Sequence, residues 1–208
     1  MDSVDGHFER LYQSGVDPWR VRDAWYEQRK RELILAALCR QRYAHAFEAG
    51  CGEGDMTLRL AQRCTQVCAV DGSPTAVQRC RIRVTAQQEK GVEVLALRLP
   101  SQWPDARQSF DLAIVSEIAY YFNDADLAGF LRRLWHCLQP GAEVVACHFR
   151  PAFSDRRQHT DAIHEAIAQM PGMTLLVHHL ETEFRLDIWR KQPPQQGHDD
   201  DRNLHSCP

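Results

Sequence analysis

Three glycines at alternate positions, Gly50, Gly52 and Gly54, are the residues whose spacing first suggests chemistry. They follow a short apolar run and precede a segment with helical periodicity, so they mark a strand-to-helix corner. Glycine weakens regular elements, but it permits positive φ angles and close approach of a ligand to the backbone. The cluster therefore predicts either a ligand-binding loop or a tight turn.

An acidic residue favours the ligand. Asp71 stands 21 residues after Gly50, at the end of the next apolar run. A carboxylate at this place can accept hydrogen bonds from both hydroxyl groups of a ribose, which favours a nucleoside. The alternative is a turn or helix-capping aspartate, since Asp71 opens the turn-like sequence DGSP.

The order of the glycines argues against a dinucleotide. Neither Gly50 nor Gly52 begins a GxGxxG pattern, and no Lys-Ser or Lys-Thr pair of a P-loop follows them. Glu53 adds a negative charge that would repel a pyrophosphate. The loop therefore favours a cationic nucleoside ligand that carries no phosphate.

The elements that must position these residues alternate between strands and helices. Such alternation indicates a parallel, doubly wound sheet, and two last strands without a helix between them indicate an antiparallel hairpin at one edge. The most apolar strand begins at Phe110 and belongs at the sheet centre. Residues 1–20 form an irregular or short helical lead-in. The predicted helices cover 22–38, 55–64, 73–88, 124–138 and 157–170; the predicted strands lie within 45–50, 66–72, 92–99, 110–122, 139–149 and 173–191, the last region broken near 181–183.

The length and charge of the chain limit its class. A chain of 208 residues suits one domain, which we divide into an N-terminal lid and helix (1–40), a core (41–191) and a tail (192–208). Almost no apolar residue follows Pro193, so the tail is predicted to be disordered. The net charge of −3 gives no general attraction to nucleic acid or anionic lipid.

The chain is expected to be cytoplasmic. Its polar start lacks the apolar centre of a secretory signal, and no apolar run approaches the roughly 20 residues that span a membrane. The eight cysteines form no CxxC pair and lie mostly in apolar patterns, which predicts reduced thiols and no metal site. They stand at positions 39, 51, 64, 68, 80, 137, 147 and 207.

Four segments, EAGCGEG, AVDGSP, FDLAIVSEIAYYF and LQPGAEVV, together resemble the S-adenosylmethionine-dependent methyltransferases of the Rossmann-like class. The resemblance spans about residues 25–190. It implies an α/β fold with a seven-stranded, mostly parallel sheet, helices on both faces and an antiparallel last strand. It also implies S-adenosyl-L-methionine as cofactor. The cofactor-binding residues predicted on this basis are Tyr26, Arg31, Glu48, Gly50, Gly52, Gly54, Asp71, Gly72, Leu99 and Ser116.

A longer segment outside these motifs, residues 7–38, together with SEIAYYF is similar to the NodS family of rhizobial nodulation N-methyltransferases. That family implies methylation of the free amino group of a de-N-acetylated chitooligosaccharide during Nod-factor synthesis. The expected partner is therefore an oligosaccharide or another small molecule, with no nucleic acid and no membrane insertion. Oligomeric state stays open.

Amine methylation needs a neutral nitrogen with a free lone pair, and a general base assists it. The predicted catalytic residues are Glu117, which follows the fourth strand, Tyr121 and His148. Each has a structural alternative: a solvated glutamate at a helix start, a tyrosine in the core beside Tyr120, and a buried histidine whose hydrogen bonds are satisfied.

Two features depart from the general methyltransferase pattern. Arg98 stands where an acidic residue often binds adenine, so backbone groups near Leu99 and apolar packing from Trp103 are expected to replace it. Ala142 replaces the second glycine of the usual Pro-Gly-Gly corner, which affects only a turn.

The resemblance also implies that a basic side chain of the N-terminal helix meets the methionine carboxylate of the cofactor. Arg29 and Arg31 do not share a helix face, so only one of them is expected to reach that carboxylate.

Three other functions remain open at this point. A methyltransferase of the same fold can act on another amine, a hydroxyl or a carboxyl group. A binding module can keep the cofactor pocket without turnover, although Glu117 and the complete glycine corner argue against it. A nicotinamide dehydrogenase fits the glycine spacing less well.

Overall fold

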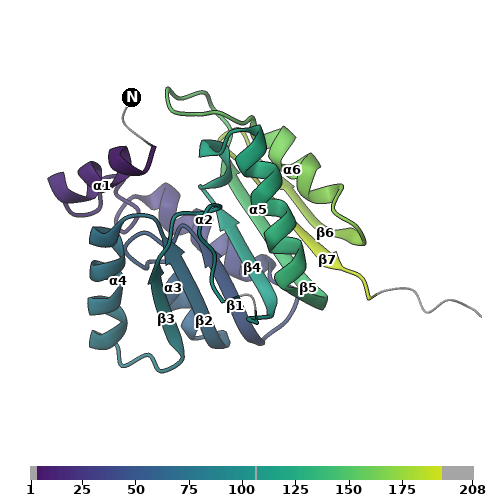
Figure 1. Cartoon of the computed structure of the whole chain (residues 1–208), viewed down its shortest axis with the longest axis horizontal. Coiled ribbons are helices and arrows are strands. Elements are labelled where there is room, and N and C mark those ends of the chain that lie inside the picture. The colour runs from purple at the N-terminus through teal and green to yellow at the C-terminus, as the bar shows by residue number, and fades with distance from the viewer. Residues whose placement is uncertain (1–3, 106, 194–208) are drawn as a thin grey trace, which may run out of the picture.

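Seven strands form one sheet in the order β3-β2-β1-β4-β5-β7-β6 in the computed structural model, which describes residues 4–105 and 107–193 (Figure 1). The pairings among β1 to β5 are all parallel, whereas β7 runs antiparallel to both β5 and β6. This confirms the predicted fold class. The strands are β1 (Tyr43–Ala49), β2 (Cys64–Asp71), β3 (Val92–Ala96), β4 (Phe110–Ser116), β5 (Leu138–Phe149), β6 (Met173–Leu180) and β7 (Phe184–Lys191).

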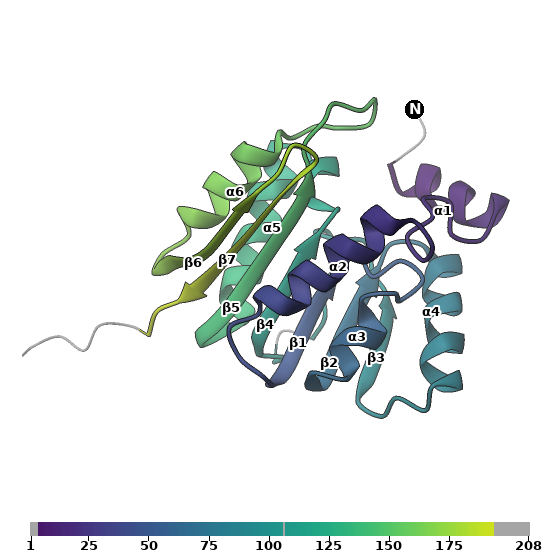
Figure 2. The ribbon, with the colours of Figure 1, turned by 180° about the vertical axis from the view of Figure 1, so that it is seen from behind.

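Helices cover both faces of the sheet because the strands are apolar on both sides. Along β1, Ala46 packs with the core beneath α2, α3 and α4, and Phe47 packs with the core beneath α5 and α6, as strand alternation requires. Figure 2 shows α2 and α3 on the face opposite α5. The helices are α1 (Val4–Ser14), α2 (Trp25–Ala37), α3 (Thr57–Ala61), α4 (Pro74–Ala86), the 3-10 turn η1 (Ala119–Tyr121), α5 (Asp124–Cys137) and α6 (Thr160–Ala168).

The central strand is β4, as its composition predicts. The first six of its seven residues are buried, and it pairs with β1 on one side and β5 on the other. Its carboxyl end therefore reaches the middle of the sheet edge where parallel α/β proteins bind ligands.

The predicted closing hairpin is confirmed at one edge of the sheet, whereas several predicted elements have other bounds: β3 ends at Ala96 instead of residue 99, and α6 is shorter than the predicted 157–170. In the hairpin, β7 inserts between β5 and β6, so the last strand of the chain is internal and β6 forms the edge. Helix α3 is shorter than the predicted 55–64, because β2 already begins at Cys64, where it pairs with Tyr43 of β1.

The N-terminal segment packs on the core through α1 and α4. The carboxylate of Glu9 accepts hydrogen bonds from the side-chain hydroxyls of Ser73 and Thr75. Ser73 caps α4 by accepting from the backbone N–H of Ala76 at 3.1 Å, and Pro74 occupies the first turn, as predicted. The lead-in thus contains one helix that docks at the start of another.

Residues 1–3 of the lead-in and 194–208 of the predicted tail, with Cys207, lie outside the described residues. All seven cysteines of the described part carry free thiols, and only Cys39 among them is exposed. Within 4–105 and 107–193, no three His, Cys, Asp or Glu side chains gather as metal ligands. In the same ranges, no helix has both the length and the apolar character needed to cross a bilayer.

Candidate active site

A pocket of about 980 Å³ opens at the carboxyl ends of the parallel strands. Residues that follow β1, β2, β3 and β4 form its floor, and side chains from α1, α2 and the segment between them form its roof. This is the edge at which open α/β sheets bind ligands. Of the predicted cofactor residues, those that line the pocket are Tyr26, Arg31, Glu48, Gly50, Gly52, Asp71, Gly72, Leu99 and Ser116.

The glycine corner divides into two roles. Gly50 and Gly52 have φ angles of +74° and +52° and line the pocket. A Cβ atom on Gly52 would lie 2.9 Å from the hydroxyl of Tyr12, so a side chain there would collide with α1. Gly54, with φ +87°, is absent from the lining, and a Cβ atom on it would lie 2.5 Å from Sγ of Cys80. Gly54 therefore packs against α4, and its predicted contact with the cofactor does not fit the structure.

Asp71 joins two loops at the pocket. Its Oδ2 accepts a hydrogen bond from the backbone N–H of Gly52 at 2.9 Å, and its Oδ1 accepts one from Ser73 at 2.8 Å. Burial raises the pKa of Asp71, and the backbone donors, Ser73 and Gly52 among them, oppose that shift by stabilising the anion. Each carboxylate oxygen keeps a lone pair for a ligand hydroxyl, so the residue suits the predicted ribose contact.

Glu48 lies beneath the glycine loop and is buried, with only 3% of the residue exposed. Burial raises the pKa of Glu48 to about 8, although a hydrogen bond from the Thr57 hydroxyl at 2.6 Å opposes the shift. The side chain is therefore largely a neutral carboxylic acid at neutral pH in the ligand-free protein.

The charge on Glu53 is compensated, which the sequence did not suggest. Arg22 and Arg79 donate to its two carboxylate oxygens at 3.0 and 2.8 Å. The backbone N–H of Asp17 lies 3.2 Å from the same carboxylate, so Glu53 also ties the N-terminal segment to the glycine loop. Repulsion of a pyrophosphate by Glu53 is thus weak, and the argument against a dinucleotide rests on glycine spacing.

Glu117 is held by donors from three elements. Its Oε1 accepts from Nζ of Lys30 at 2.7 Å, and its Oε2 accepts from the Tyr120 hydroxyl at 2.6 Å and from the backbone N–H of Phe149 at 3.1 Å. The backbone of Glu117 has φ +56°, a conformation that non-glycine residues rarely adopt and that often marks functional sites. The alternative of a solvated glutamate at a helix start does not describe this geometry.

Lys30 is the site residue that the sequence analysis missed. Its side chain is 4% exposed, and its Nζ bridges Glu117 and Glu27, the second at 2.9 Å. Burial disfavours the ammonium charge, but the two carboxylates outweigh burial and raise the pKa of Lys30. The sequence QRKR around Lys30 is typical of a solvated basic face, and the signal against that interpretation is that Lys30 lies four residues before buried Ile34 on the same helix face.

Tyr26 lines the pocket beside Lys30, whose Nζ lies 4.7 Å from the centre of the Tyr26 ring, and thus beside Glu117. Its ring contacts Phe149 and Phe184 edge to face, with centroids 6.3 and 6.1 Å away. Its hydroxyl is buried and has no hydrogen-bond partner within the described part of the chain. Burial raises the pKa of Tyr26, so the hydroxyl stays neutral at neutral pH.

Aromatic rings wall the same end of the pocket. Tyr121 packs edge to face on Phe8 of α1 at 4.7 Å, and Tyr120 packs likewise on Phe153 at 4.9 Å. Burial raises the pKa of Tyr121 to about 12, so it also stays neutral. Both tyrosines line the pocket, and Tyr120 in addition holds Glu117.

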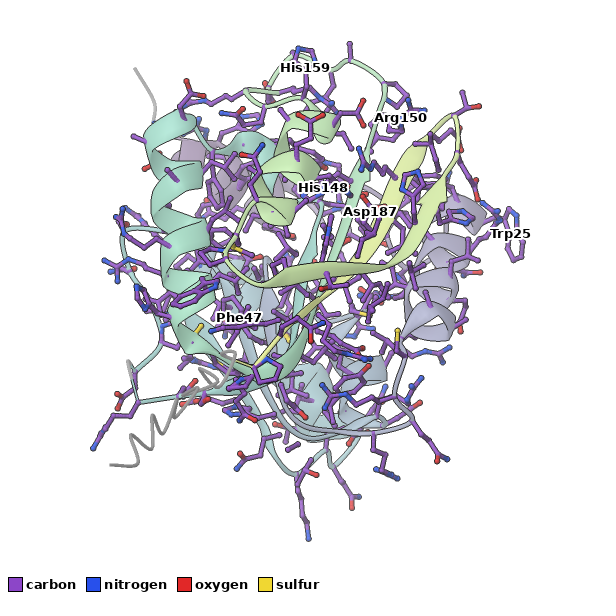
Figure 3. All side chains as sticks on the ribbon, turned by 90° about the vertical axis from the view of Figure 1, so that its right-hand side faces the viewer. Trp25, Phe47, His148, Arg150, His159 and Asp187 are labelled. Carbon is purple, nitrogen blue, oxygen red and sulfur yellow. The ribbon has the colours of Figure 1, made fainter. Side chains whose placement is uncertain are left out.

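Only one of the two candidate arginines reaches the pocket, as the helix geometry predicted. Arg31 lines it and donates to the carbonyl of Val21 at 3.1 Å. Arg29 instead makes a paired contact with Glu181 at 2.8 and 2.6 Å. Arg29 lies on the outer part of α2. Trp25, which is 74% exposed, projects into solvent from the same helix (Figure 3).

Two expectations do not fit the pocket. His148 is wholly buried outside the lining, where its Nδ1 faces Nε2 of His164 at 3.1 Å, and Nδ1 of His164 faces Asp187 at 2.7 Å (Figure 3). Burial lowers the pKa of His148, so it is a neutral core residue and does not reach a substrate. Trp103 packs between Phe47 and Phe130 in the core, so it does not supply the expected adenine contact.

The pocket therefore has two ends. The glycine corner, Asp71 and the ends of β2 and β3 fit a nucleoside cofactor, because they line the pocket at the carboxyl ends of the parallel strands and a carboxylate faces it there. The other end carries Glu117, Lys30 and the aromatic wall, and it suits an acceptor with a basic nitrogen.

Known proteins share this architecture. A family model described as a methyltransferase domain matches residues 46–141. A solved structure from Pseudomonas syringae, described as a methyltransferase, is 37% identical, covers 80% of this chain and 99% of its own, and has a TM-score of 0.68. The structure of the N-methyltransferase NodS from Bradyrhizobium japonicum WM9 with S-adenosyl-L-homocysteine has a TM-score of 0.81 at 21% identity, covering 93% and 100% of the two chains, and so shares the fold.

Two relatives that are similar in sequence carry the name Nodulation protein S. Nodulation protein S of Rhizobium tropici is 29% identical over 169 residues, which is 80% of this chain and 69% of that protein. Nodulation protein S of Sinorhizobium fredii is 30% identical over 62% of this chain and 59% of its own length. The chain therefore belongs to the methyltransferase family, and it is a NodS-like, S-adenosylmethionine-dependent enzyme of the Rossmann-like class.

Proposed function

We propose that this enzyme methylates the free amino group of a de-N-acetylated chitooligosaccharide, as the resemblance to the NodS family implies for Nod-factor synthesis. The observation that carries the proposal is the Glu117 carboxylate, held at the acceptor end of the pocket by Lys30, Tyr120 and the backbone of Phe149. A basic nitrogen that enters this end meets a fixed hydrogen-bond acceptor.

The chemistry needs that acceptor. When bound, S-adenosyl-L-methionine supplies a methyl group activated by its sulfonium. An ammonium ion has no lone pair, so the acceptor nitrogen must lose a proton before it can bond to the methyl carbon. Glu117 can take that proton, and because its side chain is held by three donors it can also orient the amine.

The aromatic wall supports a sugar as the acceptor. The rings of Tyr121 and Phe153 offer flat apolar surfaces for the apolar faces of a pyranose. The ring of Tyr26, which also lines the pocket, adds a third aromatic surface beside Lys30. These groups recognise an amino sugar better than a small aliphatic amine.

Methyl transfer tests the proposal directly. Radiolabelled methyl groups from the cofactor are expected to appear on de-N-acetylated chitooligosaccharides and not on their fully acetylated counterparts. E117Q is expected to lower kcat by about 100-fold or more and to leave the Kd of S-adenosyl-L-homocysteine within about 3-fold of the wild type. The proposal is wrong if the folded protein binds S-adenosyl-L-homocysteine but methylates no deacetylated oligomer. A panel of other amines, hydroxyls and carboxylates would then identify the acceptor.

A further inference from the structure

The ammonium of Lys30 lies between two carboxylates at the acceptor end of the pocket. It donates to Oε1 of Glu117 at 2.7 Å and to Oε1 of Glu27 at 2.9 Å, and it also faces the ring of Tyr26 at 4.7 Å. The Lys30 side chain is only 4% exposed, so water screens this group weakly. The three side chains carry a net charge of −1 when all are ionised.

One buried cation with two anionic partners has a specific electrostatic property. If Glu117 binds a proton, Lys30 keeps Glu27 as its counter-ion, so no charge is left uncompensated. With a single partner, proton uptake would leave a buried, unpaired ammonium, which is strongly unfavourable. The second carboxylate therefore makes Glu117 easier to protonate.

We propose that Glu27, Lys30 and Glu117 act as one proton-accepting unit, in which Glu117 takes the proton of the acceptor ammonium while Glu27 keeps Lys30 neutralised. The proposal rests on the amine methylation proposed above and assigns positioning roles to Glu27 and Lys30. Glu117 is the member that touches the substrate.

The step balances in atoms and charge. A proton moves from the acceptor ammonium to an oxygen of Glu117, which leaves a neutral amine and a carboxylic acid. The freed lone pair forms the nitrogen–carbon bond to the transferred methyl group, while the carbon–sulfur bond breaks and its electrons stay on sulfur. The methylated product is again an ammonium ion, and Glu117 returns its proton to water when the product leaves.

Other titratable groups that face the unit hold constant charge near neutral pH. Burial raises the pKa values of Tyr26, Tyr120, Tyr121 and the Cys147 thiol on β5, and burial lowers the pKa of His148, so all five groups stay neutral. The guanidinium of Arg31 interacts with Glu27 and opposes the rise that burial causes in the pKa of Glu27. Proton exchange with the substrate is therefore assigned to Glu117, the carboxylate of the unit that touches it.

Three variants test the unit, with E32Q as a matched control, since Glu32 is on the same helix but exposed and paired with Arg59. E27Q leaves Lys30 facing Glu117 alone, so kcat is expected to fall about 10-fold and KM to change less than about 3-fold. K30M leaves two carboxylates that share a proton, so the rising limb of kcat against pH is expected to move up by about one unit or more. E27Q/K30M restores the net charge of −1, and its rising limb is expected to return toward that of the wild type.

Infrared spectroscopy gives a second readout that needs no acceptor. All variants share the protonated carboxyl of Glu48; at neutral pH, K30M is expected to show a second protonated carboxyl, seen as a band in its difference spectrum against the wild type, which the difference spectrum of E27Q/K30M lacks. If E27Q matches E32Q in kcat, or if the double variant keeps the pH profile and infrared band of K30M, the proposed unit is wrong. If wild type methylates no amine, the proposed function fails, and the infrared comparison still decides whether Lys30 balances the two carboxylates.

Discussion

The backbone N–H of Gly52 donates to Oδ2 of Asp71 at 2.9 Å, which links the loop after β1 to the end of β2. The other oxygen of Asp71 accepts from the N–H of Ser73, the capping residue of α4. One carboxylate thus sets the relative position of the glycine loop, the neighbouring strand end and a helix start. The shape of the cofactor end follows from this connection.

Replacement of Asp71 should weaken cofactor binding. D71N keeps the size of the side chain but removes the charge that strengthens hydrogen bonds to the loop and to a ribose. We expect the Kd of S-adenosyl-L-homocysteine, measured by calorimetry, to rise about 10- to 100-fold. D105N is the control, since Asp105 is exposed and its side chain pairs only with Arg107 among its described contacts. Equal affinities of D71N and D105N would contradict the placement of Asp71.

Gly54 should matter for folding more than for binding. G54A places a Cβ atom 2.5 Å from Sγ of Cys80 and keeps a positive φ angle, so we expect a loss of about 2–4 kcal/mol in the free energy of unfolding. G54A/C80A should recover part of that loss, because the collision disappears and the backbone strain remains. G129A is the control: Gly129 lies in α5 with open space around it, and alanine there should stabilise by up to about 1 kcal/mol. Urea unfolding measures all three, and an unchanged G54A would show that α4 moves freely away.

Asp187 should stabilise the core without a part in catalysis. This wholly buried carboxylate faces His164 at 2.7 Å and His178 at 2.6 Å, and it pairs with Arg185 at 2.7 Å. D187N leaves these groups without their anion, so we expect a loss of about 3–5 kcal/mol in stability. The Kd of the cofactor product and the kcat of the folded fraction should stay close to wild type. D161N, at the exposed partner of Arg185, should cost less than about 1 kcal/mol, and a large kcat effect of D187N would restore a catalytic role to the histidine pair.

Glu48 should make the ligand-free protein less stable as pH rises. Its pKa is about 8 in the folded state and about 4.5 when unfolded, so between these values only the folded protein holds the proton. Stability attributable to Glu48 is therefore full below about pH 4.5 and decreases toward pH 8, by at most about 1.4 kcal/mol per pH unit. E48Q mimics the neutral acid and should remove this slope from urea unfolding curves measured between pH 5 and about 8.5, whereas E183Q, at an exposed position, should keep it. Parallel slopes in wild type and E48Q would contradict the raised pKa.

The residues that sequence reasoning placed correctly act through local or regular geometry. Gly50, Gly52 and Asp71 follow strands that the apolar pattern predicts, and parallel strands bring their carboxyl ends to one edge. Ser73 and Pro74 predict the start of α4, because the N-cap and the proline of the first turn are local signals. For these positions, neighbours in sequence carry enough information to predict the place in the fold.

The positions of the residues that sequence reasoning misplaced depend on side-chain contacts between elements that are distant in the chain. His148 and Phe149 are adjacent at the end of β5, yet only Phe149 lines the pocket, because successive strand residues point to opposite faces. Trp103 follows β3 in a loop, and its ring turns into the core against Phe47. Neither orientation follows from composition.

The amino-acid sequence by itself determined the alternating fold, the glycine corner and the acidic strand end, because periodicity and turn chemistry are local properties. Only the tertiary structure decided that Lys30 is buried against Glu117, 87 residues away in the chain, while its neighbours Arg29 and Arg31 are not part of that contact. The burial of an ammonium is favourable only where carboxylates from distant elements converge on it, and that convergence exists only after the helix has packed on the sheet.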